Sequence, residues 1–457
     1  MLAIFLLSPA ASVAGPCTPP VTNAVACENS LPGVPPSQWY VDGSGDDSIQ
    51  GFATKMSVAQ GETISFKIRS ETPNIRIDIL RVGYYAGNGA RMIAANLAPT
   101  GPTTQPDCEE FSDSGLIDCG NWSVTRSWTV PSTAVSGVYI ANLTRNDTGG
   151  QSQIIFVVRD DEDPADIVVQ TSDTTWQAYN DWGGNSLYKC NTSCPPGEPA
   201  GYKAAYKVSY NRPMETEGPS AFFTGAEYPM VRFLEANGYD ATYISGVDVH
   251  RRPELLLNRK LFISSGHDEY WSASQRTAME NARDAGVHLA FFTGNEGFWK
   301  TRWEPSAAGP TTQDRTLVSY KDTHFTSRQD PVEWTGTWRD PRFTTPSENV
   351  TPENALTGQS FVVNSGTSHI TVPYEFKNLR FWRNTDVASL SPGQKVDLAP
   401  DTLGYEWDED PDNGFRPPGS IRLSSTTVSD VEVFTDYGST TRFGGTATHT
   451  MTLYRAP

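Results

Sequence analysis

The chain has 457 residues, of which 37% are hydrophobic and 19% are charged. This length exceeds one ordinary hydrophobic core and predicts two domains, and the composition is too apolar for a disordered chain. Lysine and arginine total 35 against 53 aspartate and glutamate, a formal net charge of −18. Such a surface repels phosphate backbones and anionic lipid headgroups, so we expect neither nucleic acid nor a membrane as a partner.

Residues 2–14 form a short apolar segment that ends in Ser12-Val13-Ala14, a pattern that signal peptidase accepts. The segment is too short to span a bilayer. The usual basic residues are missing, because Met1 leads directly into the apolar part. We interpret residues 1–14 as a signal-peptide-like segment and expect a secreted, extracellular protein. An apolar start without a targeting role is the alternative.

Six cysteines fall in three near pairs: Cys17 with Cys27, Cys108 with Cys119, and Cys190 with Cys194. Closely spaced pairs are typical of disulfides formed in an oxidising compartment. Six cysteines allow many connectivities, so this pairing rests on proximity alone, and reduced cytosolic thiols are the alternative. The last pair has no second cysteine pair or nearby histidine, which argues against a zinc site.

Between residues 36 and 160, short β-rich segments alternate with clusters of Gly, Pro, Asn and Asp. Apolar residues recur at every second position over 63–68, 75–81 and 137–143, and a further apolar run covers 153–158. This pattern predicts an immunoglobulin-like β-sandwich. The acidic stretch 160–164 follows and is the expected domain boundary.

After Pro164 the pattern changes to apolar strands separated by helices, which predicts a parallel sheet with helices over it. We expect strands over 167–170, 241–244, 260–265 and 287–292. We expect one helix over 229–237 and another from the capping box Ser272-x-x-Gln275 to about Gly286. The chain is β-rich again beyond about Arg315. Residues 165–457 are therefore predicted to form one α/β domain with β-rich additions.

Two loops follow strands of this sheet, GHDEYW at 266–271 and TGNEGFW at 293–299. In an open α/β sheet, ligands bind beyond the carboxyl ends of the strands. His267 and Glu269 are two positions apart, so in an extended loop their side chains point to the same side. An imidazole and a carboxylate there can bind a metal or act as acid and base. Hydrogen bonds within the loop are the alternative role.

Four further strings accompany these loops: TWQAYN at 175–180, GGNSLY at 183–188, EYP at 227–229 and GYEWD at 404–408. Together the six strings resemble the large (beta) subunit of N,N-dimethylformamidase and the exported proteins built like it. RVGYY at 81–85 also resembles the N-terminal domain of that family. The resemblance therefore covers nearly the whole chain.

The resemblance implies a glutamine-amidotransferase-like α/β domain with one iron held by two tyrosines and a glutamate. Matched string by string, the implied iron ligands are Tyr179, Tyr188 and Glu269. The implied catalytic residues that line the site are His267, Asn295 and Glu406. The enzyme carries an insertion between its two tyrosines that this chain lacks, so Tyr210 is the alternative to Tyr188.

This ligand set suits Fe(III), because two phenolates and a carboxylate carry three negative charges. Binding would ionise the phenols far below their ordinary pKa of about 10. Such an ion can polarise an amide carbonyl and lower the pKa of a bound water, while His267 or Glu406 moves a proton and Asn295 positions the substrate or its oxyanion. We therefore predict a secreted hydrolase of linear amides that acts on a small amide. Aromatic packing is the alternative role of the tyrosines.

Other functions stay open. A non-catalytic secreted protein on the same fold could bind carbohydrate through its 12 tryptophans. A cysteine-nucleophile amidotransferase is disfavoured, because Cys190 and Cys194 can pair and neither lies at a strand-to-helix elbow. A serine enzyme would need G-x-S-x-G at such a turn, and none occurs there. The sequence leaves the substrate and any homo-oligomer undetermined.

Overall fold

The structure is a computed structural model that describes residues 16–41, 43–162, 165–196, 203–214, 223–324, 329–342 and 350–456. The signal-peptide-like segment 1–14 and part of the expected boundary, residues 163–164, lie outside the described residues. The described chain is β-rich, with several sheets and few helices. In this part of the chain, no helix combines the length and apolar character needed to cross a membrane.

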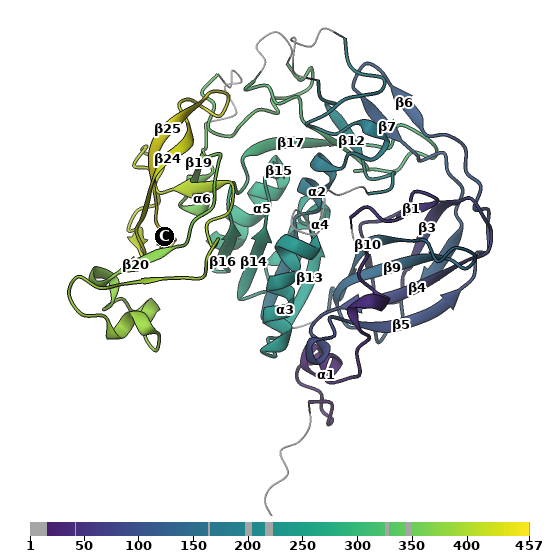
Figure 1. Cartoon of the computed structure of the whole chain (residues 1–457), viewed down its shortest axis with the longest axis horizontal. Coiled ribbons are helices and arrows are strands. Elements are labelled where there is room, and N and C mark those ends of the chain that lie inside the picture. Colours follow the sequence, from purple (N-terminus) through teal and green to yellow (C-terminus); the bar gives the residue numbers. More distant parts are fainter. Residues whose placement is uncertain are drawn as a thin grey trace, which may run out of the picture.

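Two sheets from the N-terminal third pack against each other (Figure 1). The three-stranded sheet has the order β1 (Ile49–Ala53), β3 (Thr63–Ser70), β8 (Arg126–Thr129). The five-stranded sheet has the order β2 (Ser57–Ala59), β10 (Gln151–Arg159), β9 (Gly137–Arg145), β4 (Ile75–Val82), β5 (Ala90–Leu97). The four strands predicted from the apolar patterns are confirmed as β3, β4, β9 and β10.

Strand β9 is buried along its whole length, because separate cores cover its two faces. Tyr139 and Ala141 point into the core shared with the three-stranded sheet. Val138 and Ile140 point the other way, into a core shared with the central sheet of the molecule. The five-stranded sheet is therefore sandwiched, and its outer face packs directly onto the next part of the chain.

The central sheet is parallel, as predicted, and has the order β13 (Ala241–Ser245), β11 (Ile167–Thr171), β14 (Leu261–Gly266), β16 (His288–Thr293). Helices α2 (Asp173–Tyr179) and α3 (Tyr228–Ala236) contribute to the core on one face. Helices α4 (Gly246–Arg251) and α5 (Ala273–Asp284) cover the other face. The predicted helices α3 and α5 are confirmed, and α5 starts with the expected capping box. Helix α2 was not predicted.

Two more four-stranded sheets surround the carboxyl end of the central sheet. One has the order β12 (Lys207–Ser209), β18 (Thr316–Val318), β17 (Trp299–Glu304), β15 (Tyr270–Ser272). The other has the order β22 (Trp407–Glu409), β19 (Ser360–Val363), β24 (Thr426–Phe434), β25 (Thr441–His449). This C-terminal sheet and the N-terminal sheets lie on opposite sides of the central sheet (Figure 1).

All six cysteines form disulfides in the pairs expected from proximity: Cys17–Cys27, Cys108–Cys119 and Cys190–Cys194. The last bond closes a short loop directly after Tyr188. Just before that loop, Asn185 pairs with Cys190 in an isolated bridge, and Ser186 N donates to Lys189 O at 2.7 Å. The backbone that carries Tyr188 is therefore held at both ends.

Candidate metal centre

The residues of the matching strings come together beyond the carboxyl ends of the central strands. Tyr179 is the last residue of α2, which follows β11, and His267 directly follows β14. Asn295 follows β16, and Glu406 directly precedes β22 of the C-terminal sheet. Parallel strands end at the same edge of a sheet, which explains why residues so distant in sequence meet there.

Both tyrosine hydroxyls point at Glu269, which is 2% exposed. The Tyr179 hydroxyl donates to Glu269 Oε2 at 2.9 Å, and the Tyr188 hydroxyl lies 3.0 Å from each carboxylate oxygen. The two rings stack with centroids 4.2 Å apart. Thr175 Oγ1 accepts from Glu269 N at 2.9 Å and holds the loop against α2. Two phenols thus converge on one buried carboxylate.

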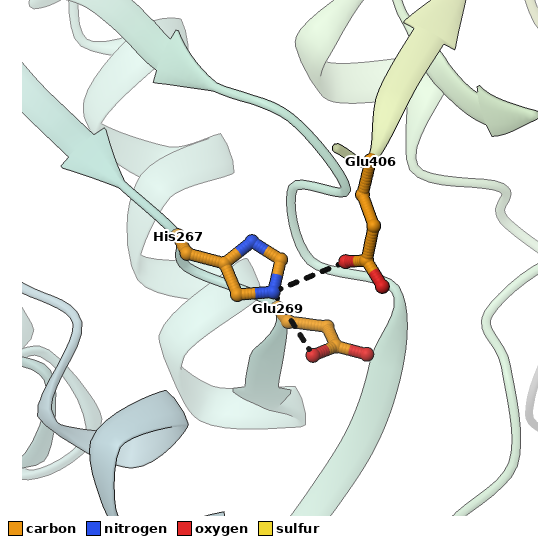
Figure 2. Close-up of side chains that lie close together, drawn as sticks. All are labelled: His267, Glu269 and Glu406. Carbon is orange, nitrogen blue, oxygen red and sulfur yellow. Dashed lines mark ion pairs between the residues drawn. The ribbon is translucent and has the colours of Figure 1, made fainter. Parts of the chain in front are cut away.

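The His267 imidazole lies on the same side of its loop as Glu269, as the two-residue spacing predicted. Its Nε2 is 3.4 Å from Glu269 Oε2 and 3.1 Å from Glu406 Oε2, and Figure 2 shows the ring pointing at both carboxylates. Asn295 Nδ2 donates to the same Glu406 oxygen at 2.9 Å. Among the described residues, His267, Glu269 and Glu406 form a group whose ligand atoms lie within 4.8 Å of one another, close enough to hold a metal ion.

Close backbone approach brings Glu406 and Asn295 together. A Cβ on Gly294 would lie 2.1 Å from the carbonyl oxygen of Glu406, so only glycine fits there. Asn295 itself has a positive φ of 56°, and its N–H donates to Asp408 Oδ1 at 2.9 Å. The TGNEGFW and GYEWD strings therefore contact each other directly, through Gly294 and Glu406 and through Asn295 and Asp408.

Tyr188 is 38% exposed, but its hydroxyl, like that of Tyr179, is enclosed against Glu269. This local burial and the charge of Glu269 raise the pKa of both hydroxyls well above the ordinary value. Burial alone would lower the pKa of His267, but its hydrogen bonds to Glu269 and Glu406 outweigh it and raise that pKa well above the ordinary value. In the metal-free protein the phenols are neutral and His267 is an imidazolium. A cation held by Tyr179, Tyr188 and Glu269 would have to displace the two phenol protons.

Tyr210, the alternative to Tyr188, lies elsewhere. Its buried hydroxyl donates to Asp173 Oδ2 at 2.9 Å, near the start of α2. Tyr188 is thus the tyrosine that the fold places beside Glu269, together with Tyr179.

Glu227 of the EYP string supports α2 and does not join the cluster around Glu269. Its Oε1 accepts from Trp176 Nε1 at 2.6 Å and from the backbone N–H of Ser172 at 3.2 Å, and it also accepts from the Ser172 hydroxyl. Burial raises its pKa to about 8, so the side chain is a neutral acid at pH 7. The string therefore marks a structural contact that positions the helix carrying Tyr179.

Two residues next to the site were not identified from the sequence. The Tyr270 hydroxyl donates to the Tyr188 hydroxyl at 2.6 Å. Lys321 is 3% exposed, and its Nζ lies 3.3 Å from the centroid of the Tyr188 ring. Tyr270 belongs to the GHDEYW string and could have been found there. Lys321 follows β18 in a stretch without any motif, so only the fold reveals it.

Comparison with known proteins agrees with the strings. A family model described as N,N-dimethylformamidase beta subunit-like, C-terminal, matches residues 76–457. A search of curated proteins finds no match. Among solved structures, the alkylpurine DNA glycosylase AlkC of Pseudomonas fluorescens, bound to DNA containing an abasic site analog, is similar over 24% of this chain and 30% of that chain, with 14% identity and a TM-score of 0.14. So low a score carries no argument. The family model covers most of the chain, and the chain therefore belongs to the N,N-dimethylformamidase beta subunit-like family.

Proposed function

We propose that this protein is a secreted, metal-dependent hydrolase of small linear amides, with one Fe(III) held by Tyr179, Tyr188 and Glu269. The observation that carries the proposal is the convergence of two phenol hydroxyls on Glu269, at 2.9 and 3.0 Å. The family supports a hydrolase of the N,N-dimethylformamidase type. Three disulfides are compatible with an extracellular protein.

The donor set fits a trivalent cation on chemical grounds. Hard oxygen ligands prefer such ions, and two phenolates with one carboxylate neutralise three positive charges. The stacked rings already place both oxygens against the carboxylate, so little rearrangement is needed. A second donor set, His267 with Glu269 and Glu406, shares Glu269 with the first, and the experiment below separates the two.

The chemistry that a bound Fe(III) supplies is polarisation of an amide carbonyl and a lower pKa for a bound water. The residues of the chain then handle the proton. In the metal-free protein the charges of Glu269 and Glu406 keep a proton on His267 Nε2. With Glu269 bound to a cation, the imidazole would lose that proton more readily, and it could then accept the proton of the attacking water and pass it to the leaving nitrogen as the C–N bond breaks. Asn295 Nδ2 fixes the orientation of Glu406, which in turn orients the imidazole.

We further propose that residues 36–160 form an immunoglobulin-like sandwich and that residues 165–457 form a glutamine-amidotransferase-like domain. The first part of this proposal is supported by two sheets around one core, and the second by the parallel order of the central sheet. The shared core between them means that both parts support the site.

The test is metal analysis of the purified protein together with amide turnover. We expect one iron per chain, visible absorption from phenolate-to-iron charge transfer, and release of amine from small amides such as N,N-dimethylformamide. Tyr179→Phe, Tyr188→Phe and Glu269→Gln should each lose iron and colour, whereas Tyr210→Phe is the matched control that should retain both.

His267→Ala separates the two donor sets. We expect it to keep iron and colour and to lose amide hydrolysis, because its role is proton transfer. Loss of metal in His267→Ala, with metal retained in Tyr179→Phe, would replace the proposed ligands by the set with His267 and Glu406. Iron without turnover of any amide would instead favour a binding protein.

A further inference from the structure

A cavity lies between the N-terminal sheets and the central part of the molecule, and its lining does not include Tyr179, Tyr188, His267, Glu269 or Glu406. One wall comes from β1 and β10, and the other comes from α2, the segment 210–214 and Phe223. The space open to the centres of water molecules is about 60 Å³, which is room for a few waters or for one small ligand. Cavities between domains are common ligand sites.

The walls of this cavity include polar side chains, among them Gln153, Gln177 and Thr224, together with large apolar ones. The lining side chains of this kind are Phe52, Met56, Ile154, Trp176, Met214 and Phe223. Trp176 and Phe223 are each 1% exposed, and Phe52 is 4% exposed, so the lining belongs to the packed interior. An apolar wall of this kind favours the hydrocarbon part of a ligand.

Two buried cations, Arg212 and Arg315, line the same cavity. Arg212 donates from Nη1 and Nη2 to backbone carbonyl oxygens of the segment 180–185. Arg315 is 5% exposed. Its Nε donates to Asn211 Oδ1 at 2.8 Å. Its Nη2 donates to the carbonyl oxygens of Ala53 at 2.8 Å and Tyr210 at 2.7 Å. All three acceptors are neutral. Within the described residues, Arg315 Nη1 makes no hydrogen bond. No carboxylate oxygen of these residues lies within 4.0 Å of a nitrogen of the Arg315 guanidinium, so Arg315 forms no ion pair with them. Two of the five N–H donors of the guanidinium are thus free.

The charge of Arg315 persists at neutral pH. Burial lowers its pKa to about 10, which still leaves the group cationic at pH 7. The negative charge of Asp118 raises the pKa of Arg315 without forming an ion pair with it. The Asp118 carboxylate instead accepts hydrogen bonds from the N–H groups of Gly120 and Ala307, each at 2.8 Å. A buried cation without an adjacent anion is costly, and an anionic ligand would offset that cost. The chain carries a net charge of −18, so only a locally built site attracts an anion.

We propose that this cavity binds a small aliphatic monocarboxylate, with the carboxylate on Arg315 Nη1 and the hydrocarbon part between Phe52 and Trp176. A guanidinium N–H pair suits a carboxylate, and the size of the space suits a chain of about two to four carbon atoms. The proposal does not rest on the metal centre or on amide hydrolysis.

Titration of the full-length, disulfide-bonded protein with sodium propanoate tests the proposal. Ionic strength is held constant with chloride, and butanone serves as the neutral analogue of propanoate. We expect saturable heat of binding with propanoate and none with butanone. Arg315→Met should weaken binding by at least about tenfold, because it removes a charge-assisted hydrogen bond.

Two controls locate the bound anion. Lys55→Met removes a half-exposed charge at the rim of the cavity, one already paired with Glu62 at 3.2 Å, and should bind propanoate as the wild type does. Glu269→Gln should also bind propanoate, because the site does not involve the metal. Undiminished binding in folded Arg315→Met, or binding lost in Glu269→Gln, would overturn the proposal.

Arg315 also joins Ala53 to Tyr210, so a folding defect in Arg315→Met would obscure that result. Crystals of the wild-type protein soaked in 3-bromopropanoate avoid the problem, and the described chain has no free thiol to react with it. We expect an anomalous bromine peak between Phe52 and Trp176. A bromine peak only at other places, or none at a saturating concentration, would contradict the proposal.

Discussion

Hydrogen-bond donors from three different loops and helices surround the Glu269 carboxylate. The hydroxyls of Tyr179 and Tyr188 and the Nε2 of His267 all lie within 3.4 Å of its oxygens. The carboxylate charge raises the pKa of both phenols and of the imidazole, so each keeps its proton without a metal. A bound trivalent ion would instead lower the pKa of both phenols, so that they would lose their protons.

Lys321 is a buried lysine in the wall of this site. Burial lowers its pKa to about 7, below the ordinary value of 10.5. Between about pH 7 and pH 10 the unfolded chain therefore binds a proton that the folded protein does not, and stability rises with pH through this range.

We predict that metal-free Lys321→Met is more stable than metal-free wild type at pH 7. The substitution removes the buried charge and keeps a chain of similar length over the Tyr188 ring. Its advantage should shrink by about 1.4 kcal/mol for each pH unit between pH 7 and 9, as measured by urea unfolding. Lys55→Met, at a half-exposed lysine, is the control and should show no such slope. A constant difference across this pH range would contradict the prediction.

At the scale of elements, α2 is a seven-residue helix whose first turn contacts several neighbouring segments. Its Asp173 accepts from Tyr210 Oη at 2.9 Å and from Gly246 N at 2.5 Å. Glu227 accepts three hydrogen bonds from Ser172 and Trp176 at the same end. These contacts set the position of Tyr179 at the far end of the helix.

We predict that Glu227→Ala destabilises the protein by about 2–4 kcal/mol and lowers its iron content. The substitution leaves three buried donors without an acceptor and loosens α2. Glu227→Gln keeps an acceptor oxygen in place and should retain most of the stability and the iron at pH 7, where the wild-type acid is already neutral. Chemical unfolding and metal analysis measure both effects. Equal iron in wild type and Glu227→Ala would show that α2 is positioned without Glu227.

The loop that carries Tyr188 offers a second test at this scale. We predict that replacing Cys190 and Cys194 by serine costs about 2 kcal/mol and lowers iron content, because the loop is then free to move its tyrosine. The matched control is replacement of Cys17 and Cys27, which close a loop of similar kind far from the site. That control should lower thermal stability and leave the iron in place. Equal iron loss in both variants would count against a local effect.

At the scale of the whole molecule, the N-terminal sheets and the central sheet share one core. A buried ion pair crosses this interface, because Arg81 of β4 donates to both oxygens of Glu235 in α3 at 2.8 and 2.9 Å. Both side chains are fully buried. Tyr243 of β13 also donates to Glu235, at 2.9 Å. The RVGYY string thus marks the attachment of the N-terminal sheets to α3 and the central sheet.

We predict that Arg81→Met destabilises the protein by about 3–5 kcal/mol, because it leaves the Glu235 carboxylate buried without its partner. The double variant Arg81→Met with Glu235→Leu should recover part of this loss, since it removes both charges together. Urea unfolding of the two single variants and the double variant gives the coupling. Strictly additive effects would show that the ion pair does not join the two parts.

Local patterns in the sequence were sufficient for most of the regular elements. Alternating apolar residues predicted β3, β4 and β9, and a capping box predicted the start of α5, because both signals depend on neighbours a few positions away. The disulfide partners were likewise close in sequence. Helix α2 was not predicted from the sequence, because it has only seven residues and little apolar periodicity. Such a short helix depends on tertiary contacts for its stability.

Part of the candidate site could likewise be predicted from the sequence, and part of it could not. The strings around Tyr179, His267 and Asn295 were recognisable in the sequence, and their places after successive strands of a parallel sheet implied that they would meet. Which of Tyr188 and Tyr210 lies beside Glu269, and that Lys321 covers the ring of Tyr188, depends on loops and sheets far apart along the chain. The cavity around Arg315 likewise exists only where two sheets and a helix meet. Such contacts are set by packing between distant segments, and the sequence of any one segment carries no trace of them.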